Sequence, residues 1–298
     1  MRIMVAEYAV GEGIHEFTPE GRAMLRTLVR SFASCGHEVF YPTAGTQLDE
    51  GAGIRAEDFE ESITRISKQC DAGLIIAPDE ILGDLTELVE ENTVNLGCPA
   101  DSVRLCADKL KCTSILSQEK IPVPETIESG EYKGDYVIKP RSGCASDGIH
   151  RSVSGRLKEG FIATQFIEGE HLSVSIITGR TQLPLTVNRQ LIDINNTISY
   201  KGGTVPYYCA RNSEIVEIAK KALELLGCRG YAGVDIVLGD RPYVVDVNPR
   251  PTTSIIGISR VIGTEIADLI LKSRFGELPH KVDVNGSFTF KKDELFRL

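Results

Sequence analysis

One stretch of the chain combines a lysine with a loop of small residues and could hold phosphate. An apolar run at 136–139 ends in Lys139, and the loop that follows contains Ser142, Gly143, Ser146 and Gly148. Such a loop can direct backbone N–H groups at phosphate oxygens, while the lysine supplies a point charge. A glycine turn between two strands, with an exposed lysine, would produce the same residues. The stretch alone leaves both interpretations open.

A second stretch, nearer the end of the chain, is typical of a β-hairpin that carries carboxylates. Asp246 and Asn248 are two residues apart, so on a strand their side chains share one face, and Asp235 lies near the start of the partner strand. Hard divalent ions such as Mg²⁺ prefer such oxygens, with phosphates completing the shell. The hairpin therefore predicts a metal site. A solvent-facing polar row, with Arg250 as a surface charge, is the alternative.

The first hundred residues alternate between strand-like and helical patterns. Apolar runs are expected to form strands at 2–8, 38–41 and 72–77, with helices at 18–35 and 57–70. This alternation predicts a doubly wound parallel sheet. Pro99 and the residues after it indicate a boundary near residue 100, which a helical pair is expected to follow.

The remainder of the chain has closely spaced strand patterns, which predict an antiparallel sheet. Strands are expected at 136–139, 162–167, 172–178, 183–192, 233–238 and 243–247. A helix is expected at 214–226, and a single C-terminal helix at about 258–272. These patterns divide the chain into three expected parts, residues 1–100, 101–166 and 167–298.

Composition excludes several classes of partner. The formal net charge of -9 argues against nucleic acid or an anionic membrane surface, because both require clustered Lys and Arg. No apolar run approaches the roughly 20 residues of a membrane-spanning helix, and the start of the chain does not resemble a signal peptide, so we expect a cytoplasmic protein. The 8 cysteines form no C-x-x-C pair, which favours buried or inert thiols over zinc ligands.

The order of these motifs resembles the ATP-grasp superfamily of carboxylate–amine ligases. The resemblance rests on Asp108-Lys109, Lys139-Pro140, the loop 142–148, the segment 164–169 and the segment 246–250. It implies an α/β fold in which the doubly wound parallel domain precedes two α+β subdomains that clasp ATP. It also implies ATP with Mg²⁺ or Mn²⁺ as cofactors, small-molecule amino-acid and amine substrates, and an acyl phosphate intermediate.

The resemblance assigns expected roles to individual residues. Lys109 and Lys139 would contact ATP phosphates, and the loop 142–148 would close over them as a flap. The segment 164–169 would form a hinge, and the backbone groups of Gln165, Phe166 and Ile167 in it would line the edge of the adenine. The family's metal ligands match Asp235, Asp246 and Asn248, although Asp246 is shorter than the glutamate often found there. Arg250 would steady the acyl phosphate and the tetrahedral intermediate, which makes it a catalytic candidate together with Lys139.

The ribose position departs from the family pattern, which usually reads Glu-Gly-x-Glu. Here the segment reads Glu168-Gly169-Glu170-His171, so His171 occupies the position that usually carries the acid. Either Glu168 or Glu170 would then substitute for it. A partly exposed strand histidine is the alternative for His171.

Three further segments, at 5–9, 187–190 and 200–204, are similar to those of one branch of the superfamily, which joins tyramine to L-glutamate in methanofuran biosynthesis. That resemblance implies substrate contacts from Glu7, Tyr8, Arg189, Lys201 and Gly202. Arg189 and Lys201 would suit a substrate carboxylate, or they are solvated strand charges. A ligase for another amino acid or amine, and a nucleotide-binding regulatory protein without turnover, are the alternatives. A homodimer is a possible assembly.

Overall fold

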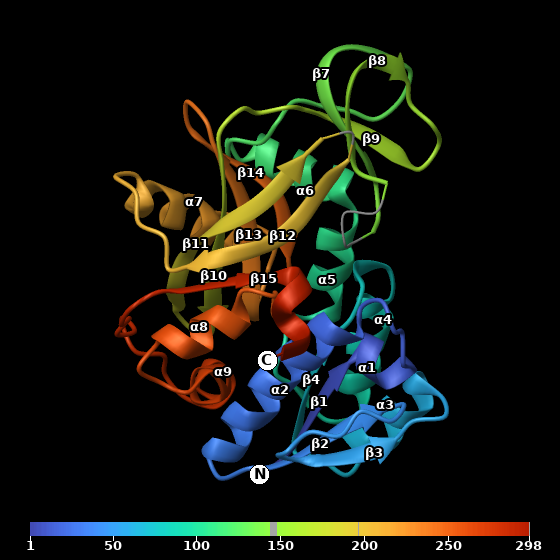
Figure 1. Ribbon diagram of the computed structural model, residues 1–298, viewed down its shortest axis with the longest axis vertical. Coiled ribbons are helices and arrows are strands. Elements are labelled where there is room, and N and C mark those ends of the chain that lie inside the picture. The colour runs from blue at the N-terminus through green and yellow to red at the C-terminus, as the bar shows by residue number, and fades with distance from the viewer. Residues whose placement is uncertain (144–147, 196, 298) are drawn as a thin grey trace.

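The computed structural model describes residues 1–143, 148–195 and 197–297, and residue 297 through its backbone only (Figure 1). Within these residues the chain forms a five-stranded, a four-stranded and a six-stranded sheet. In Figure 1 the five-stranded sheet lies at the bottom, the six-stranded sheet in the middle and the four-stranded sheet at the top. The predicted α/β fold class is confirmed.

The N-terminal sheet is parallel and carries helices on both faces, as predicted. Its strands, in spatial order, are β3 (Ala52–Arg55), β2 (Glu38–Thr43), β1 (Arg2–Glu7), β4 (Ala72–Ile76) and β5 (Val94–Asn95). Ile3 and Val5 of β1 share a buried cluster with α2 (Thr18–Ser34). Met4 and Ala6 are buried with α3 (Phe59–Ser67) and α4 (Asp79–Asn92) on the other face. Side-chain alternation along a fully buried strand produces this arrangement.

The strand order reverses between β1 and β4. The chain proceeds from β1 to β2 and β3 on one side, then continues on the other side with β4 and β5. In open α/β sheets the crevice at such a reversal, beyond the carboxyl ends of the strands, is the usual ligand site. Glu7 ends β1, and Asp79 begins the helix that follows β4. The topology therefore brings two acidic residues to this crevice.

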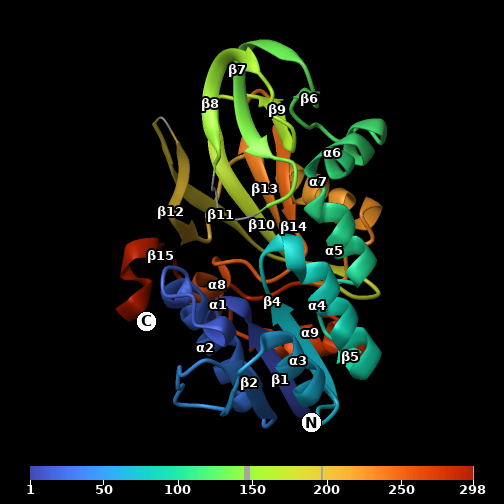
Figure 2. The same cartoon turned by 90° about the vertical axis from the view of Figure 1, so that its right-hand side faces the viewer.

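Two helices lead from the N-terminal sheet to the four-stranded sheet (Figure 2). Asp108 separates α5 (Ala100–Ala107) from α6 (Lys109–Gln118) and caps α6 by accepting a hydrogen bond from the Lys111 N–H at 3.2 Å. The four-stranded antiparallel sheet has the order β6 (Thr126–Ile127), β9 (Phe161–Gln165), β7 (Glu131–Pro140) and β8 (His150–Arg156). Its small buried cluster consists of Tyr132, Ile138 and Ala163.

The six-stranded sheet is antiparallel; one of its faces is apolar, and the other combines a polar row with buried apolar residues such as Ile177 and Leu183. Its strands, in spatial order, are β14 (Pro242–Asn248), β13 (Gly230–Leu238), β10 (Glu170–Thr178), β11 (Gln182–Ile194), β12 (Ile198–Val205) and β15 (Phe288–Lys291). Leu172 and Ile236 lie opposite each other on the apolar face, which α7 (Asn212–Leu225) helps to bury. Ser173 and Asp235 lie opposite each other on the polar face.

The predicted C-terminal helix at 258–272 is wrong in one respect, because two helices occupy this region. α8 (Ile255–Val261) and α9 (Ile266–Phe275) are separated where Ile262 forms an isolated β-bridge with Val284. The Gly263 N–H also donates to the Asp283 carbonyl at 3.0 Å. These pairings with a later segment remove the backbone groups from the helical pattern, which local sequence does not reveal. The first strand likewise ends at Glu7, since Tyr8 begins α1 (Tyr8–Glu12).

The last described segment ties the six-stranded sheet to the N-terminal domain. β15 pairs with β12, and a 3₁₀ helix (Lys292–Arg297) follows it. The Lys292 ammonium lies 2.8 Å from the Glu20 carboxylate of α2. Residues from α2, α8 and α9 also share one buried cluster. The first and the last parts of the fold are therefore packed as one body.

The described cysteines are free, and the expectation of buried thiols is confirmed for Cys98, Cys106, Cys112 and Cys228. Three others, at positions 35, 70 and 209, are half-buried, and Cys144 lies outside the described residues. Among the helices of the described ranges, none combines the length and apolar character needed to cross a membrane.

Candidate active site

Lys109 and Asp246 form the centre of the site. The Lys109 ammonium lies 3.3 Å from an Asp246 carboxylate oxygen and 3.6 Å from an Asp79 oxygen, and the lysine is only 5% exposed. Burial alone would lower the pKa of Lys109, but the two carboxylates raise it above its ordinary value. The ammonium therefore remains charged, as a phosphate-binding group requires.

Arg250 joins this group through the same aspartate. Its Nε lies 3.4 Å from the other oxygen of Asp79, and its side chain is 15% exposed. Arg250 follows β14, whereas Lys109 begins α6 and Asp79 begins α4. Three segments that are distant in sequence thus contribute one buried, charged cluster. The expectation that Arg250 and Asp246 belong to one site agrees with this geometry.

Lys139 lies at the end of β7, where the four-stranded sheet meets the hairpin. Its ammonium donates to the Val245 carbonyl at 3.0 Å, and its side chain is 8% exposed. Burial lowers the pKa of Lys139, and the attraction of Asp246 offsets part of that effect. This lysine is not the exposed residue that a simple turn would place here.

The Asp108-Lys109 motif also anchors the start of the small-residue loop. Asp108 accepts two hydrogen bonds from the Arg141 guanidinium, at 2.8 and 2.7 Å, and the Lys109 N–H donates to the Arg141 carbonyl at 2.9 Å. Gly143 has a φ of 135°, which favours glycine, and Gly148 has a φ of 71°. Ser142 is exposed, while Ser146 and the rest of 144–147 lie outside the described residues. The predicted flap stays a prediction.

A continuous polar row crosses the six-stranded sheet. Asn188, Ser173, Asp235 and Asp246 lie directly opposite one another on β11, β10, β13 and β14. Burial, and then the neighbouring charge of Asp246, raises the pKa of Asp235 to about 7. Two carboxylates in register therefore repel each other unless a cation or a proton lies between them.

The proposed metal ligands fit a hard divalent ion. Asn248 lies close enough to donate to Asp235 at 3.2 Å, so the amide and two carboxylates converge. The described residues contain no group of three or more His, Cys, Asp or Glu side chains placed to hold a metal. Mg²⁺ takes one or two carboxylates and completes its shell with phosphates and water, and Asp235, Asp246 and Asn248 offer donors of that kind. When bound, such an ion would neutralise phosphate charge at the carboxylate pair.

The hinge residues lie where β9 leaves the four-stranded sheet. The Phe166 N–H donates to the Asp135 carbonyl at 2.8 Å, and the Gln165 N–H to the Glu125 carbonyl at 2.7 Å. The Arg151 guanidinium lies 3.8 Å from the centre of the Phe166 ring. These two N–H groups are thus engaged within the protein, and Ile167 is half-buried.

The ribose candidates separate onto different faces of the sheet. His171 is on the polar face with Ser173, and burial lowers its pKa, which favours the neutral imidazole. Glu170 is on the apolar face opposite Leu238, and both of its carboxylate oxygens accept from the Tyr207 hydroxyl, at 2.9 and 3.0 Å. Glu168 is exposed. The structure thus brings His171, and not Glu170, to the polar face.

Glu7 reaches the crevice, whereas Tyr8 turns away from it. The Glu7 carboxylate accepts from the Val10 N–H at 2.8 Å and is packed against Gly21, where a Cβ would lie 2.2 Å from Oε2. Burial raises the pKa of Glu7 to about 7, and Arg250 offsets a small part of this. Tyr8 packs edge-on against Phe59 of α3, with ring centres 5.4 Å apart.

The substrate contacts expected of Arg189, Lys201 and Gly202 stay predictions. Arg189 lies opposite Leu172 on the apolar face, with its guanidinium 5.5 Å from the Tyr207 ring centre. Lys201 is exposed at a bulge in β12. Gly202 has a packing reason, since a Cβ there would lie 2.1 Å from the Phe290 carbonyl oxygen of β15.

Sequence reasoning missed several polar residues that face the site. The Asn188 side chain is 2% exposed, and its Oδ1 has no partner among the described residues. Gln190 donates to Asp235 at 3.0 Å. Burial, then the charges of Glu20 and Asp235, raises the pKa of Tyr200. Asp79 was missed although it follows an apolar strand and Pro78, the position where a parallel sheet presents its ligand-binding residues.

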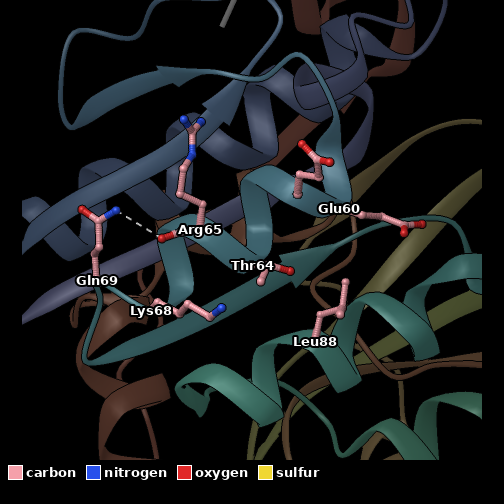
Figure 3. A pocket seen from close by; sticks show the side chains of 7 residues that line it. Glu60, Thr64, Arg65, Lys68, Gln69 and Leu88 are labelled. Atoms are coloured by element: carbon pink, nitrogen blue, oxygen red, sulfur yellow. Dashed lines mark hydrogen bonds between the residues drawn. The ribbon is translucent and has the colours of Figure 1, made fainter.

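A hollow of about 580 Å³ lies elsewhere, between α3 and α4 (Figure 3). Its lining mixes charges from Glu60, Glu61, Arg65 and Lys68, and Gln69 donates to the Arg65 carbonyl at 3.2 Å. None of its residues belongs to the charged cluster around Lys109. A smaller cavity of about 10 Å³ does touch that cluster, between α6 and β14. We assign the chemistry to the charged cluster, because its groups are buried and convergent.

The fold and this site define the class of protein. A profile of the ATP-grasp domain matches residues 106–254, which include Lys109, Lys139, Asp235, Asp246 and Asn248. The chain belongs to the ATP-grasp family, as the resemblance in its motifs implied. It is an ATP-dependent ligase of the kind that forms C–N bonds.

The similarity to known proteins covers nearly the whole chain. A tyramine–L-glutamate ligase from Methanocaldococcus fervens is 30% identical over 97% of this chain and 100% of its own. The protein of the same name from Methanocaldococcus jannaschii is 29% identical, covering 92% and 90%. Among solved structures, an ATP-grasp superfamily protein from Archaeoglobus fulgidus has a TM-score of 0.83 at 30% identity, covering 98% of this chain and 92% of that one.

Proposed function

We propose that this protein joins the γ-carboxylate of L-glutamate to the amine of tyramine, with release of ADP and phosphate, as a step in methanofuran biosynthesis. The observation that carries the proposal is the convergence of Lys109, Arg250 and the Asp235–Asp246 pair at one crevice. The choice of substrates rests on the full-length similarity to two ligases of that name.

In the first step a glutamate oxygen attacks the γ-phosphorus of ATP, the bond to the bridging oxygen breaks, and ADP leaves. Lys109 and Lys139 provide positive charge at the phosphates, and both are buried enough for that charge to act strongly. Mg²⁺ or Mn²⁺ held by Asp235, Asp246 and Asn248 would supply further neutralisation of phosphate charge. Catalysis of this kind consists mainly of positioning and charge stabilisation.

In the second step the amine nitrogen attacks the acyl carbon, and the C–O bond to phosphate breaks. Negative charge develops on the acyl oxygen as the tetrahedral intermediate forms. The leaving phosphate carries away the electron pair and takes up the proton that the nitrogen loses. The Arg250 guanidinium lies at this crevice, where its Nε is 3.4 Å from an Asp79 oxygen, and we assign it to this step. Donors placed where charge develops lower the barrier most.

An ADP-release assay with tyramine, L-glutamate, ATP and Mg²⁺ tests the proposal, with mass spectrometry of the product. Expected is ADP formation that requires both substrates and yields γ-glutamyltyramine. Phenethylamine, L-aspartate and D-glutamate serve as matched alternatives. If the protein prefers another pair of substrates, the assigned substrates are wrong and the assignment as a ligase stands. If it binds ATP but releases ADP with no pair, the assignment as a ligase is contradicted.

A further inference from the structure

Asp79 occupies a position at which the N-terminal domain reaches the proposed reaction centre. It is the first residue of α4, directly after Pro78, at the crevice where the strand order reverses. Its side chain is 7% exposed. A buried carboxylate requires charge partners, because it has lost most of its hydration.

Each oxygen of Asp79 faces a different cation. Oδ2 lies 3.6 Å from the Lys109 ammonium, and Oδ1 lies 3.4 Å from the Arg250 Nε. Lys109 also has Asp246 as a partner, at 3.3 Å. Two buried cations repel each other, so a carboxylate between them sets both their spacing and their direction.

Helix stabilisation alone does not explain Asp79. An acid in the first turn of a helix does interact favourably with the helix dipole. Glu80, the next residue, is also in the first turn of α4 and is exposed, so the helix already has an acid that avoids the cost of burial. The buried position and the two cations need a separate reason.

We propose that Asp79 is a positioning residue, which holds Arg250 and Lys109 at the spacing where they flank the transferred phosphoryl group. The inference rests on the proposed function for the identity of that group. Asp79 itself is not required to touch substrate. It acts through Arg250 and Lys109, and it couples the N-terminal domain to the phosphate-binding residues of α6 and β14.

The Asp79→Asn variant tests this inference, because it keeps the shape and removes the charge. Misplacement of a catalytic group and loss of a supporting contact typically cost about 10- to 100-fold, and we expect kcat to fall by that factor. The ATP dissociation constant, measured by calorimetry with Mg²⁺ and no second substrate, is expected to stay the same or decrease. The reason is that the substitution removes the negative charge of Asp79 from the proposed ATP phosphate site, while Lys109 keeps its contact with Asp246.

The matched control is Asp84→Asn. Asp84 is also on α4, but it is exposed and pairs with Arg104 at 2.9 Å on the surface. Neither kcat nor ATP affinity should change in that variant. The inference is wrong if Asp79→Asn leaves kcat intact. It is also wrong if kcat falls together with weaker ATP binding and a lower melting temperature, because Asp79 is then a structural residue.

Two further variants extend the test, and the first of them replaces Asp79→Asn if that variant does not fold. Asp79→Glu keeps the charge but shifts the carboxylate by one methylene, so kcat should fall while ATP affinity is retained; a wild-type kcat would contradict a positioning role. Adding Asp79→Asn to Arg250→Ala should lower kcat less than the two separate effects predict, because both act through one group. Full additivity would overturn the inference. If the wild-type protein releases no ADP, the proposed function fails, and an ATP affinity of Asp79→Asn weaker than that of wild type would still overturn the inference.

Discussion

The two faces of the six-stranded sheet are built from the same strands but have different roles. On one face Leu172, Val174 and Ile236 are fully buried beneath α7 and neighbouring elements. On the other face Ser173 and Asp235 lie in a polar row that reaches Asp246. Consecutive residues of one strand thus serve stability and chemistry in turn. Assigning a function to a strand residue therefore depends on its face as much as on its type.

The largest effect is expected on the polar face, at Asp246. Asp246→Ala removes a proposed metal ligand and a partner of the buried Lys109 ammonium, so turnover should fall on the order of 10³-fold or more. ADP release at saturating Mg²⁺ measures it. Glu170→Gln, on the opposite face, is the control and should change turnover little. A similar loss in both variants would break the distinction between the faces.

Arg250 is expected to give the next largest effect. Arg250→Ala should bind ATP nearly normally and lose about 10² to 10³ in kcat, roughly 2.7 to 4 kcal/mol, because the guanidinium acts where charge develops. Lysine should rescue only part of the loss, since a point charge does not reproduce the planar fork. Steady-state kinetics together with nucleotide calorimetry separate the two quantities. Weakened ATP binding with kcat preserved would mean that Arg250 holds the ground state.

The neighbours Asn188 and Arg189 sharpen the comparison within one strand. Asn188→Leu removes a buried amide from the polar face, including an Oδ1 that has no partner among the described residues. If a substrate binds this oxygen, its KM should rise about tenfold in the variant, which corresponds to about 1.4 kcal/mol. Arg189→Ala, on the apolar face, should change KM less than twofold. Measuring KM for the amine and the amino acid separately identifies the affected substrate. A larger rise in KM for Arg189→Ala than for Asn188→Leu would show that the substrate binds on the apolar face of the sheet.

The last expected effect concerns the stability of the fold at the crevice and not turnover. The pKa of Glu7 is raised by burial from 4.5 to about 7, so between these values the folded state keeps a proton that the unfolded state releases. Glu7 therefore makes stability fall as pH rises through this window. Glu7→Gln should be about 1 to 3 kcal/mol more stable than wild type at pH 8, with no advantage at pH 4. Melting curves check this, with the exposed Glu12→Gln as control.

The sequence predicted the elements that rest on local periodicity. The alternation before residue 100 and most of the longer antiparallel strands were predicted, because buried strands and amphipathic helices leave a signal in each window. The single antiparallel sheet that was expected is two sheets, and β3, β5, β6, β8 and β15 were not predicted. The helix α4 was missed although Leu82, Leu85 and Val89 have helical spacing, because its N-cap residue Pro78 provides no side-chain cap. β12 was missed because its two glycines interrupt the strand pattern.

The site was predictable to the extent that its motifs are local. Lys109, Lys139, Asp246 and Arg250 could be named because each belongs to a recognisable segment. The face of Arg189 could not be read in advance, because a shift of one residue in register exchanges the two faces of a strand. Asp79 and Tyr200 require knowledge of which segments meet at the crevice, and that information lies in the tertiary packing.

The distribution of buried clusters has a consequence for cooperativity and motion. Both large clusters contain residues of the N-terminal sheet together with residues of the six-stranded sheet or its helices. Heating is therefore expected to unfold these two regions in a single calorimetric transition. The four-stranded sheet has its own small cluster of Tyr132, Ile138 and Ala163 and is joined to the rest by polar contacts such as that of Arg141 with Asp108. It is the unit suited to rotate as a rigid body about the hinge, carrying Lys139 toward or away from the phosphates.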